Sequence, residues 1–257
     1  MSEAQQASSS GGQYSSIGRA LEILEACAAA EEPLSITEIA KRTRISTSAV
    51  HRTCWKLVDL GALTQVGHGF NLGMRVIALG GSSPWLRFLR TEAAPLLHRL
   101  ASETGLSGNL ACLVSGKAML VDEVFSAEFG VPKELGRKLP LHATAIGKAL
   151  LVNRSESEIE RILGNKELDR YTPATVCDKE QLIEELVSAR EQGYVLSKGD
   201  WKMGRFGVGA PVLADGVTVA SIALIGSLAF TILDGLGERV REAAAQLTAK
   251  LSSDQKN

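Results

Sequence analysis

Residues 35–61 read SITEIAKRTRISTSAVHRTCWKLVDLG and contain the signals of two short helices joined by a tight turn. Ser35 occupies a helix N-cap position and Glu38 follows three residues later, which is the spacing of a capping box. Helical periodicity resumes over Thr47–Leu60, and Gly61 is typical of the end of such a helix. Two helices separated by a turn of three or four residues form a helix-turn-helix unit.

The segments on either side complete a small domain. Apolar residues at helical spacing predict a helix over 16–30, upstream of the pair. Downstream, residues 62–66 and 70–72 read as two strands around a Gly-His-Gly turn, which makes a hairpin wing. Ala40 lies where the two central helices cross, and Ile45 is an apolar plug in their turn. The sequence therefore predicts a winged helix-turn-helix.

The second helix of the pair places polar side chains on one face. Between residues 35 and 75, six basic residues stand against two acidic ones, although the formal net charge of the whole chain is −1. Hydroxyls, an imidazole and cations on one helix face suit phosphate and base-edge contacts in a DNA major groove. Two other interpretations stay open: a solvated basic face, or a helical domain with a hairpin that binds no DNA. The residues predicted on the exposed face are Thr47, Ser48, His51, Arg52 and Lys56.

Beyond the wing, helices and strands alternate. Residues 73–84 predict a short linker helix followed by a Gly-Gly-Ser-Ser-Pro hinge. A longer helix is predicted over 85–104, in which Pro95 marks either a kink or the true start. Strands over 109–114 and 118–125 flank a Ser-Gly-Lys turn, which predicts a hairpin.

The last third of the chain continues this mixture. Residues 140–149 lead into a helix, and an Asp-x-x-Gln cap with a closing Gly193 bounds another over 179–192. Strands are predicted around 207–213 and 218–225. Strands mixed with helices in this order predict an α+β fold. A last amphipathic helix is predicted to turn inward the side chains of Leu233, Leu236, Val240, Leu247 and Leu251.

Composition excludes several classes of protein. The chain has 257 residues, enough for two domains, and no run reaches the ~18 apolar residues of a membrane span. Residues 1–15 are rich in Ser, Gln and Gly, so a disordered tail is expected rather than a signal peptide, and with it a cytoplasmic location. The cysteines are far apart and are expected to be buried and reduced. They are Cys27, Cys54, Cys112 and Cys177.

Enzyme motifs are not found. Gly147-Lys148 lacks the Gly five residues earlier that a phosphate-binding loop requires, because residue 142 is His. Gly-x-Ser-x-Gly and His-Glu-x-x-His patterns are missing, and the four His and four Cys are scattered. We therefore expect no catalytic residue, no metal and no cofactor. An enzyme or a free-standing ligand-binding module is the alternative class, and it would leave promoter DNA unshifted.

From about Ile17 to Leu251, the chain resembles the IclR-type transcription regulators. The resemblance lies in the order and spacing of several motifs rather than in any one of them. They are Arg19-Ala20-Leu21-Glu22-Ile23-Leu24, Thr37-Glu38-Ile39-Ala40, Phe70-Asn71-Leu72-Gly73, Ala94-Pro95-Leu96, PLHATAIGKALL at 140–151, Arg190 through Tyr194, and Ala210-Pro211-Val212.

The resemblance implies a winged helix-turn-helix, a linker helix and a GAF/profilin-like α/β effector-binding domain. Such proteins form dimers and often tetramers, bind double-stranded operator DNA near catabolic operons, and sense small organic or aromatic acids. Repression is the favoured direction of regulation. The expected organisation is a tail over 1–15, a DNA-binding domain over 16–72, a linker helix and hinge over 73–84, and an effector-binding domain over 85–253.

The resemblance also implies a pocket lined by the segment after Pro-Leu-His, the strand containing Ala210-Pro211 and the final strand. Relatives commonly carry a Glu a few residues before the position of Gly204, where Asp200 is the nearest equivalent here. The predicted effector contacts are Ala145, Ile146, Ser197, Asp200, Arg205, Gly207, Ala223 and Ile225. The predicted DNA contacts add Arg19, Ser35, Arg44, Ser46 and His68 to the five exposed residues named above.

Arg205 is the leading candidate for ligand recognition, because a guanidinium can hold a carboxylate through two hydrogen bonds. A surface arginine at a strand start, or an ion pair with Asp200, is the alternative. His142 and Lys148 flank a helix N-terminus, where an anion is favoured. For His142, a hydrogen-bonded structural role is the favoured interpretation.

Overall fold

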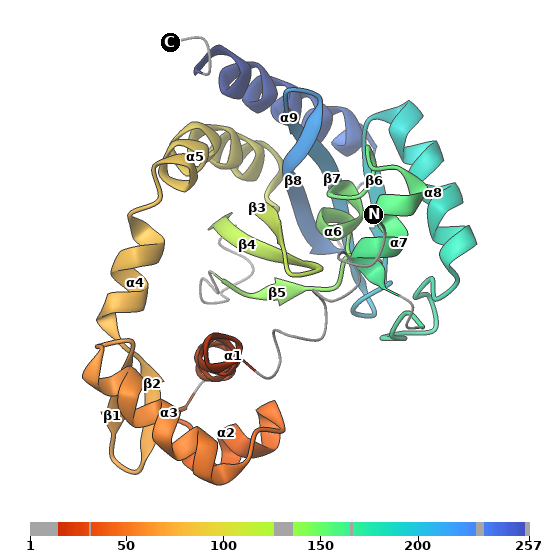
Figure 1. Cartoon of the computed structure of the whole chain (residues 1–257). Helices are drawn as coiled ribbons and strands as arrows, with labels where there is room; N and C mark the ends of the chain where they lie inside the picture. The colour runs from red at the N-terminus through yellow and green to blue at the C-terminus, as the bar shows by residue number, and fades with distance from the viewer. Residues whose placement is uncertain (1–14, 31, 126–135, 165–166, 230–233, 255–257) are drawn as a thin grey trace, which may run out of the picture. The chain divides into compact units, whose positions relative to one another are not determined.

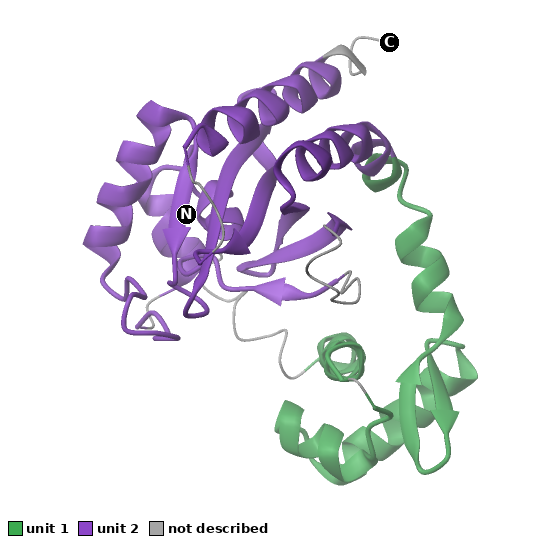
Figure 2. Cartoon of the chain, turned by 180° about the vertical axis from the view of Figure 1, so that it is seen from behind, with its two compact units in different colours: residues 1–87 green, residues 88–257 purple. Residues whose placement is uncertain are grey.

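The computed structural model describes residues 15–30, 32–125, 136–164, 167–229 and 234–254 (Figure 1). The chain divides into two compact units, residues 1–87 and 88–257 (Figure 2). Of the tail predicted over 1–15, only Ser15 is described; its side chain accepts a hydrogen bond from the Gly18 N–H and caps the first helix.

The first unit has the predicted order of three helices, a hairpin and a linker helix. Its two strands pair antiparallel and form the wing. The first helix ends at Ala28 rather than at residue 30. The bounds are α1 Ser16–Ala28, α2 Ile36–Thr43, α3 Thr47–Asp59, β1 Leu63–Val66, β2 Gly69–Leu72 and α4 Met74–Gly81.

Local signals at the ends of α2 and α3 act as predicted. The Ser35 N–H donates to the Glu38 carboxylate at 2.8 Å, and the Ser35 hydroxyl accepts from the Glu38 N–H at 3.3 Å, so the capping box is complete. Arg44 ends α2 in the left-handed conformation, with φ 58°. Gly61 follows the last residues of α3 with φ +70°, where a side chain would be strained.

One apolar core joins the three helices to the wing. Ala40 and Ile45 pack against it, partly buried, as their predicted positions require. Burial raises the pKa of the Cys27 and Cys54 thiols to about 11, so both stay protonated at neutral pH. The buried members of this core are Ile23, Cys27, Leu34, Ile39, Val50, Cys54, Leu57, Leu63 and Phe70.

A six-stranded antiparallel sheet, in the order β5-β4-β3-β8-β7-β6, forms the centre of the second unit. The hairpin predicted around the Ser-Gly-Lys turn is β3–β4. On its other side β3 pairs with β8, which comes near the end of the chain. The bounds are β3 Ser107–Val114, β4 Lys117–Val124, β5 Lys138–Leu139, β6 Val195–Lys198, β7 Arg205–Ala214 and β8 Val217–Ser227.

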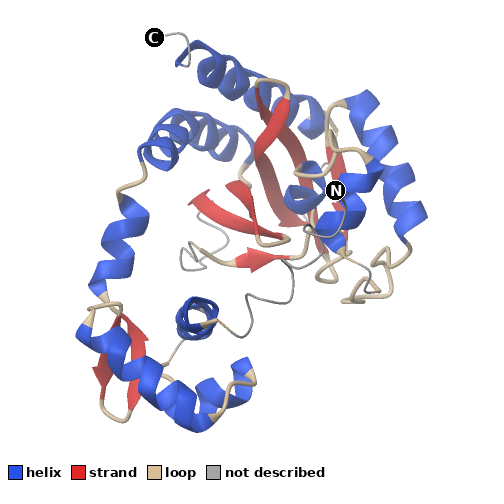
Figure 3. Cartoon of the chain, viewed as in Figure 1, coloured by secondary structure: helices blue, strands red, loops and turns tan. Residues whose placement is uncertain are grey.

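Helices cover both faces of this sheet (Figure 3). The last helix, α9, packs on β7 and β8. It lies beside α5, to which it is joined by ion pairs of Lys250 with Glu92 at 2.6 Å and of Arg239 with Glu103 at 2.8 Å. The short helix α6 packs on the other face of β7. The bounds are α5 Pro84–Thr104, α6 Ala145–Ala149, α7 Glu156–Leu163, α8 Lys179–Gln192 and α9 Leu236–Asp254.

Three elements, β5, α7 and β6, have no counterpart among the predictions. The two strands are too short to show a periodicity. A capping box of Ser155 and Glu158 opens α7 and could have located it. Pro95 lies inside α5 and does not mark its start. Of the inward residues predicted for the last helix, Leu233 lies outside the described residues, and the buried ones are Leu236, Val240, Leu247 and Leu251.

Candidate DNA-binding surface and effector pocket

Helix α3 presents a polar face to solvent and an apolar face to the core of the first unit. Val50, Cys54 and Leu57 are its buried residues. Positions four apart lie on the same side of a helix, so two neighbouring rows of side chains run along the opposite face. The exposed residues there include all five that the sequence predicts, namely Thr47, Ser48, His51, Arg52 and Lys56.

Trp55 lies on the same exposed face and was missed as a candidate. Its indole N–H donates to Nε2 of His51 at 3.3 Å, and its ring packs edge-on against Phe70 of the wing at 5.8 Å. Because Nε2 accepts this bond, a neutral His51 carries its proton on Nδ1 and has a donor there. The spacing of four residues between His51 and Trp55 is the sequence signal for this pair.

The other predicted DNA contacts surround α3 in sequence. Arg44 is exposed between α2 and α3, and Ser46 is the N-cap residue of α3. His68 is exposed at the tip of the wing, and Arg19 is partly buried on α1. The Ser35 hydroxyl is already engaged in the capping box of α2. Contact of these residues with DNA stays a prediction.

A pocket of about 150 Å³ opens in the second unit, and paired residues of four strands form its floor. Ser107 on β3 pairs with Ile225 on β8, Ile225 with Gly207 on β7, and Gly207 with Ser197 on β6. Directly opposed residues point to the same face of a sheet, so these four line the pocket together. A Cβ at Gly207 would lie 3.1 Å from the Cβ of Ala145. Because Gly207 has no side chain, α6 can lie over the strands and form the pocket wall opposite the floor.

Seven of the eight predicted effector contacts line this pocket, and Ala223 does not. Ala223 pairs with Gly209, beyond Ile225 on β8, and is fully buried in the core cluster that includes Ile146. A Cβ at Gly209 would lie 2.6 Å from the Ala145 carbonyl oxygen, so α6 covers this part of the sheet. The seven lining residues are Ala145, Ile146, Ser197, Asp200, Arg205, Gly207 and Ile225.

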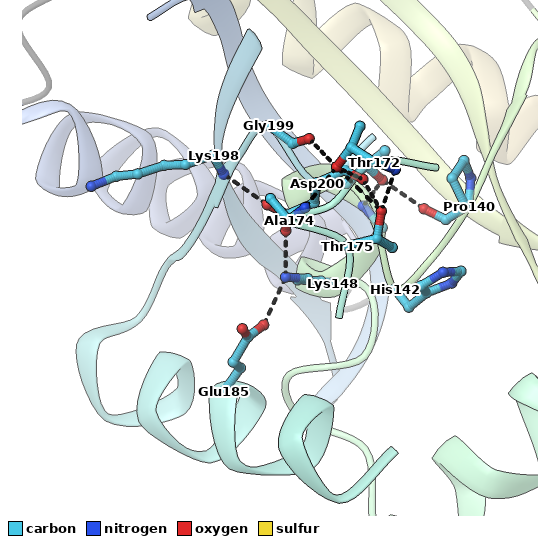
Figure 4. A network of polar contacts seen from close by, with 12 residues as sticks. Pro140, His142, Lys148, Thr172, Ala174, Thr175, Glu185, Lys198, Gly199 and Asp200 are labelled. Atoms are coloured by element: carbon cyan, nitrogen blue, oxygen red, sulfur yellow. Dashed lines mark hydrogen bonds and ion pairs between the residues drawn. The ribbon is translucent and has the colours of Figure 1, made fainter. Parts of the chain in front are cut away.

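Asp200 is held by a buried ion pair rather than left open to a ligand (Figure 4). Lys148 Nζ lies 2.7 Å from Asp200 Oδ2 and 2.7 Å from Glu185 Oε2, and its side chain is 1% exposed. The other Asp200 oxygen accepts from the Lys198 N–H at 3.0 Å. Both carboxylate oxygens therefore already have partners in the protein.

Two threonines fix the backbone of the same loop (Figure 4). The Thr175 hydroxyl donates to the Asp200 carbonyl at 2.6 Å, and the Thr172 hydroxyl donates to the Gly199 carbonyl at 2.8 Å. Together with the Lys148 ion pair, these bonds anchor a loop that carries four lining residues of the pocket, Gly199 to Lys202. The pocket wall is thus positioned by residues far away in sequence.

Cationic side chains and an indole ring line the pocket beside this loop. Arg205 is exposed at the start of β7 and lines the pocket, as predicted. Arg137 and Lys202, which were missed, also line it, with Arg137 Cζ and Lys202 Nζ each 4.7 Å from the centre of the Trp201 ring. Glu123 lines the pocket as well as the ion-paired Asp200, so the three cations leave an excess of positive charge there. Such an excess beside an aromatic surface suits an anion with an apolar body.

His142 has the structural role that its favoured interpretation predicts. It is buried, its Nε2 lies 2.9 Å from the Asp169 carbonyl oxygen, and its ring packs against Tyr171. Burial lowers the pKa of this imidazole, which favours the neutral ring at neutral pH. His142 does not line the pocket, so it contributes nothing to the candidate site there.

Among the residues that the structure describes, no three or more His, Cys, Asp or Glu side chains gather in a way that could hold a metal ion. In the same residues, no helix combines the length and the apolar character needed to cross a membrane.

A winged helix-turn-helix followed by a pocket-bearing α+β unit defines a transcription regulator with a DNA-binding part and a small-molecule-binding part. The chain belongs to the IclR family. Residues 16–67 match the IclR helix-turn-helix domain, and residues 87–249 match the C-terminal domain of the bacterial transcriptional regulator IclR. The matched families and relatives are regulators and not enzymes. This decides against the alternative interpretation of the chain as an enzyme or a free-standing ligand-binding module.

Named relatives are similar over most of the chain. The transcriptional repressor IclR of Escherichia coli K12 is 30% identical over 198 residues, 75% of this chain and 72% of the relative. The p-hydroxybenzoate hydroxylase transcriptional activator of Acinetobacter baylyi is 32% identical over 216 residues, 80% of this chain and 79% of the relative. Among solved structures, an IclR homolog from Microbacterium hydrocarbonoxydans in complex with 4-hydroxybenzoate has a TM-score of 0.79 at 25% identity, covering 93% of this chain and all of that one.

Proposed function

We propose that this regulator represses a catabolic operon and senses a small organic or aromatic acid that changes its affinity for operator DNA. The pocket carries the proposal, because apolar lining residues such as Ile146 and Ile225 and the Trp201 indole ring stand beside Arg137, Lys202 and Arg205. Such a site suits a carboxylate on an apolar body. A cavity of about 150 Å³ accommodates one benzene-sized ring.

The relatives support both the sensing of an acid and the repression of an operon. One is solved with an aromatic acid bound, and another is named for the control of an enzyme that acts on an aromatic acid. Repressors are frequent among the named relatives, which supports repression here. A regulator of this kind would act in the cytoplasm, where its operator lies.

Fluorescence anisotropy tests the proposal with a labelled duplex that the full chain first selects from a random library. An acid from a panel of aromatic and aliphatic carboxylates should weaken binding to this duplex about fivefold or more, the usual range for coupled sites. Failure to select any duplex would refute the DNA-binding part. If the duplex binds and no acid changes its affinity, the sensing part is wrong.

In the same titration, Lys56→Ala should weaken binding to different duplexes to a similar extent. The slope of log Kd against log salt concentration should fall by about one unit, because one phosphate contact fewer releases one counterion fewer. Arg52→Ala should act in the same direction. Lys117→Ala removes an equal charge from an exposed site in the second unit and is the matched control. Unchanged affinity in both α3 variants would contradict the assignment of this face to DNA.

We further propose a homodimer or a dimer of dimers, held by apolar faces of the first unit. Half-sites of a palindromic operator lie about 34 Å apart or a multiple of that, so two copies of the DNA-binding unit are needed. Apolar residues on α1 and α4 are exposed in the single chain. Light scattering at micromolar concentration should give the mass of a dimer or tetramer, and a monomer would contradict the proposal. The exposed residues are Ile17, Leu21, Met74, Ile77 and Leu79.

A further inference from the structure

Asn109 places an unsatisfied hydrogen-bond acceptor in the wall of the pocket. It lies on β3, lines the pocket together with Ser107, and is 1% exposed. Its Nδ2 donates to the Ser107 carbonyl at 3.2 Å. Within the described ranges, Asn109 Oδ1 and Thr218 Oγ1 are the buried side-chain polar atoms that have no hydrogen-bond partner. Buried polar atoms are rarely left in this state, because losing hydration without a replacement bond is unfavourable.

The Ser107 carbonyl determines which end of the Asn109 amide, the nitrogen or the oxygen, has no hydrogen-bond partner. Rotating the Asn109 amide by 180° would set its oxygen against the carbonyl oxygen of Ser107, so the nitrogen must stay where it is. The atom that remains is therefore an acceptor. Its missing partner must be a donor, such as a hydroxyl or an amino group.

Asn109 and Arg205 lie on different strands of the pocket floor. Arg205 begins β7 and Asn109 belongs to β3, with β8 between them. The gap is two strand spacings, about 10 Å, across the sheet and four residues, about 13 Å, along it, because Arg205 pairs with Ser227 and Asn109 with Ala223 on β8. The long Arg205 side chain shortens that gap. A ligand held by its carboxylate at Arg205 would extend across Ile225 toward Asn109.

We infer that Asn109 accepts a hydrogen bond from the effector and thereby selects acids that carry a hydroxyl or amino group away from the carboxylate. This inference rests on the proposed function, since it concerns the same pocket. A site built to bond such a group discriminates strongly against the analogue that lacks it, because the buried acceptor is then left unpaired. Asn109 is thus a specificity-determining residue and is not needed to hold the carboxylate.

Matched pairs of acids test the inference by calorimetry on the full chain. Suitable pairs are benzoate with 4-hydroxybenzoate and phenylacetate with 4-hydroxyphenylacetate. The hydroxylated member of at least one pair should bind tenfold or more tightly than its partner. Asn109→Leu, which removes the acceptor at similar volume, should bring the two members of that pair within about threefold. The unhydroxylated acid should bind at least as tightly as it does to the wild-type chain, because no acceptor is then left unpaired beside it.

Thr218→Val is the matched control, because it removes the other unpartnered buried atom outside the pocket lining and should keep the preference. Equal affinities within every pair for the wild-type chain would overturn the inference and leave the proposed function standing. If no acid of any pair or of the wider panel binds, both are overturned. If Asn109→Leu fails to fold, two other measurements decide the question. One is the preference of the wild-type chain for the hydroxylated acid. The other is the preference of Asn109→Ser, which should be smaller than that of the wild-type chain but larger than the preference expected for Asn109→Leu.

Discussion

Lys148→Met should destabilise the second unit by about 3–5 kcal/mol, the usual cost of breaking a buried ion pair by removing one partner. The Lys148 side chain is 1% exposed and that of Asp200 is 9% exposed, so the variant strands a carboxylate in the protein interior. Glu185 is 38% exposed and can turn to water. Urea unfolding can follow this unit through Trp201 fluorescence in a background with Trp55→Phe and Trp85→Phe.

Two companion variants separate the buried charge from other causes. Arg239→Met breaks an exposed ion pair with Glu103, both partners being about half exposed, and should cost no more than about 1 kcal/mol. Adding Asp200→Asn to Lys148→Met removes the stranded charge and should restore more than half of the lost stability. If Lys148→Met costs no more than Arg239→Met, the buried pair does not hold the pocket loop as described.

Arg205→Ala should lower the affinity for the acid effector at least tenfold, while binding to the selected duplex without effector stays unchanged. A carboxylate buried without its cation costs roughly 2–5 kcal/mol, and the exposed mouth of the pocket places the effect toward the lower end. DNA binding survives because α3 belongs to the other unit of the chain. Calorimetry with the acid that the anisotropy panel identifies measures the change.

The neighbouring cations provide the comparison for this prediction. Arg161→Ala removes the same charge from the exposed surface of α7, away from the pocket lining, and should leave the affinity intact. Lys202→Ala should cost less than Arg205→Ala if the guanidinium holds the carboxylate. Full affinity in Arg205→Ala combined with a large loss in Lys202→Ala or Arg137→Ala would place the carboxylate at the Trp201 side of the pocket.

Local features of this protein could be predicted from the sequence because a few neighbouring residues produce them. The capping box of Ser35 and Glu38, the left-handed Gly61 and the cap at Asp178 each satisfy backbone groups within one turn. The polar face of α3 follows from the helical period alone. The ordered motifs along the chain also indicated the family, and with it seven of the residues that line the pocket. The pair of His51 and Trp55 was equally local and was overlooked.

Other features depend on residues that only folding brings together. The pocket floor exists because β3 pairs with β8, and neither strand carries a local signal that names its partner. Lys148 and Asp200 are far apart in sequence, and charge pairing at such separation depends on how α6 and the loop after β6 pack. Ala223 was assigned to the pocket although α6 covers it, and Asn109 was overlooked although its oxygen remains unpaired. Burial and hydrogen-bond satisfaction are properties of the packed tertiary structure, so only that structure could decide them.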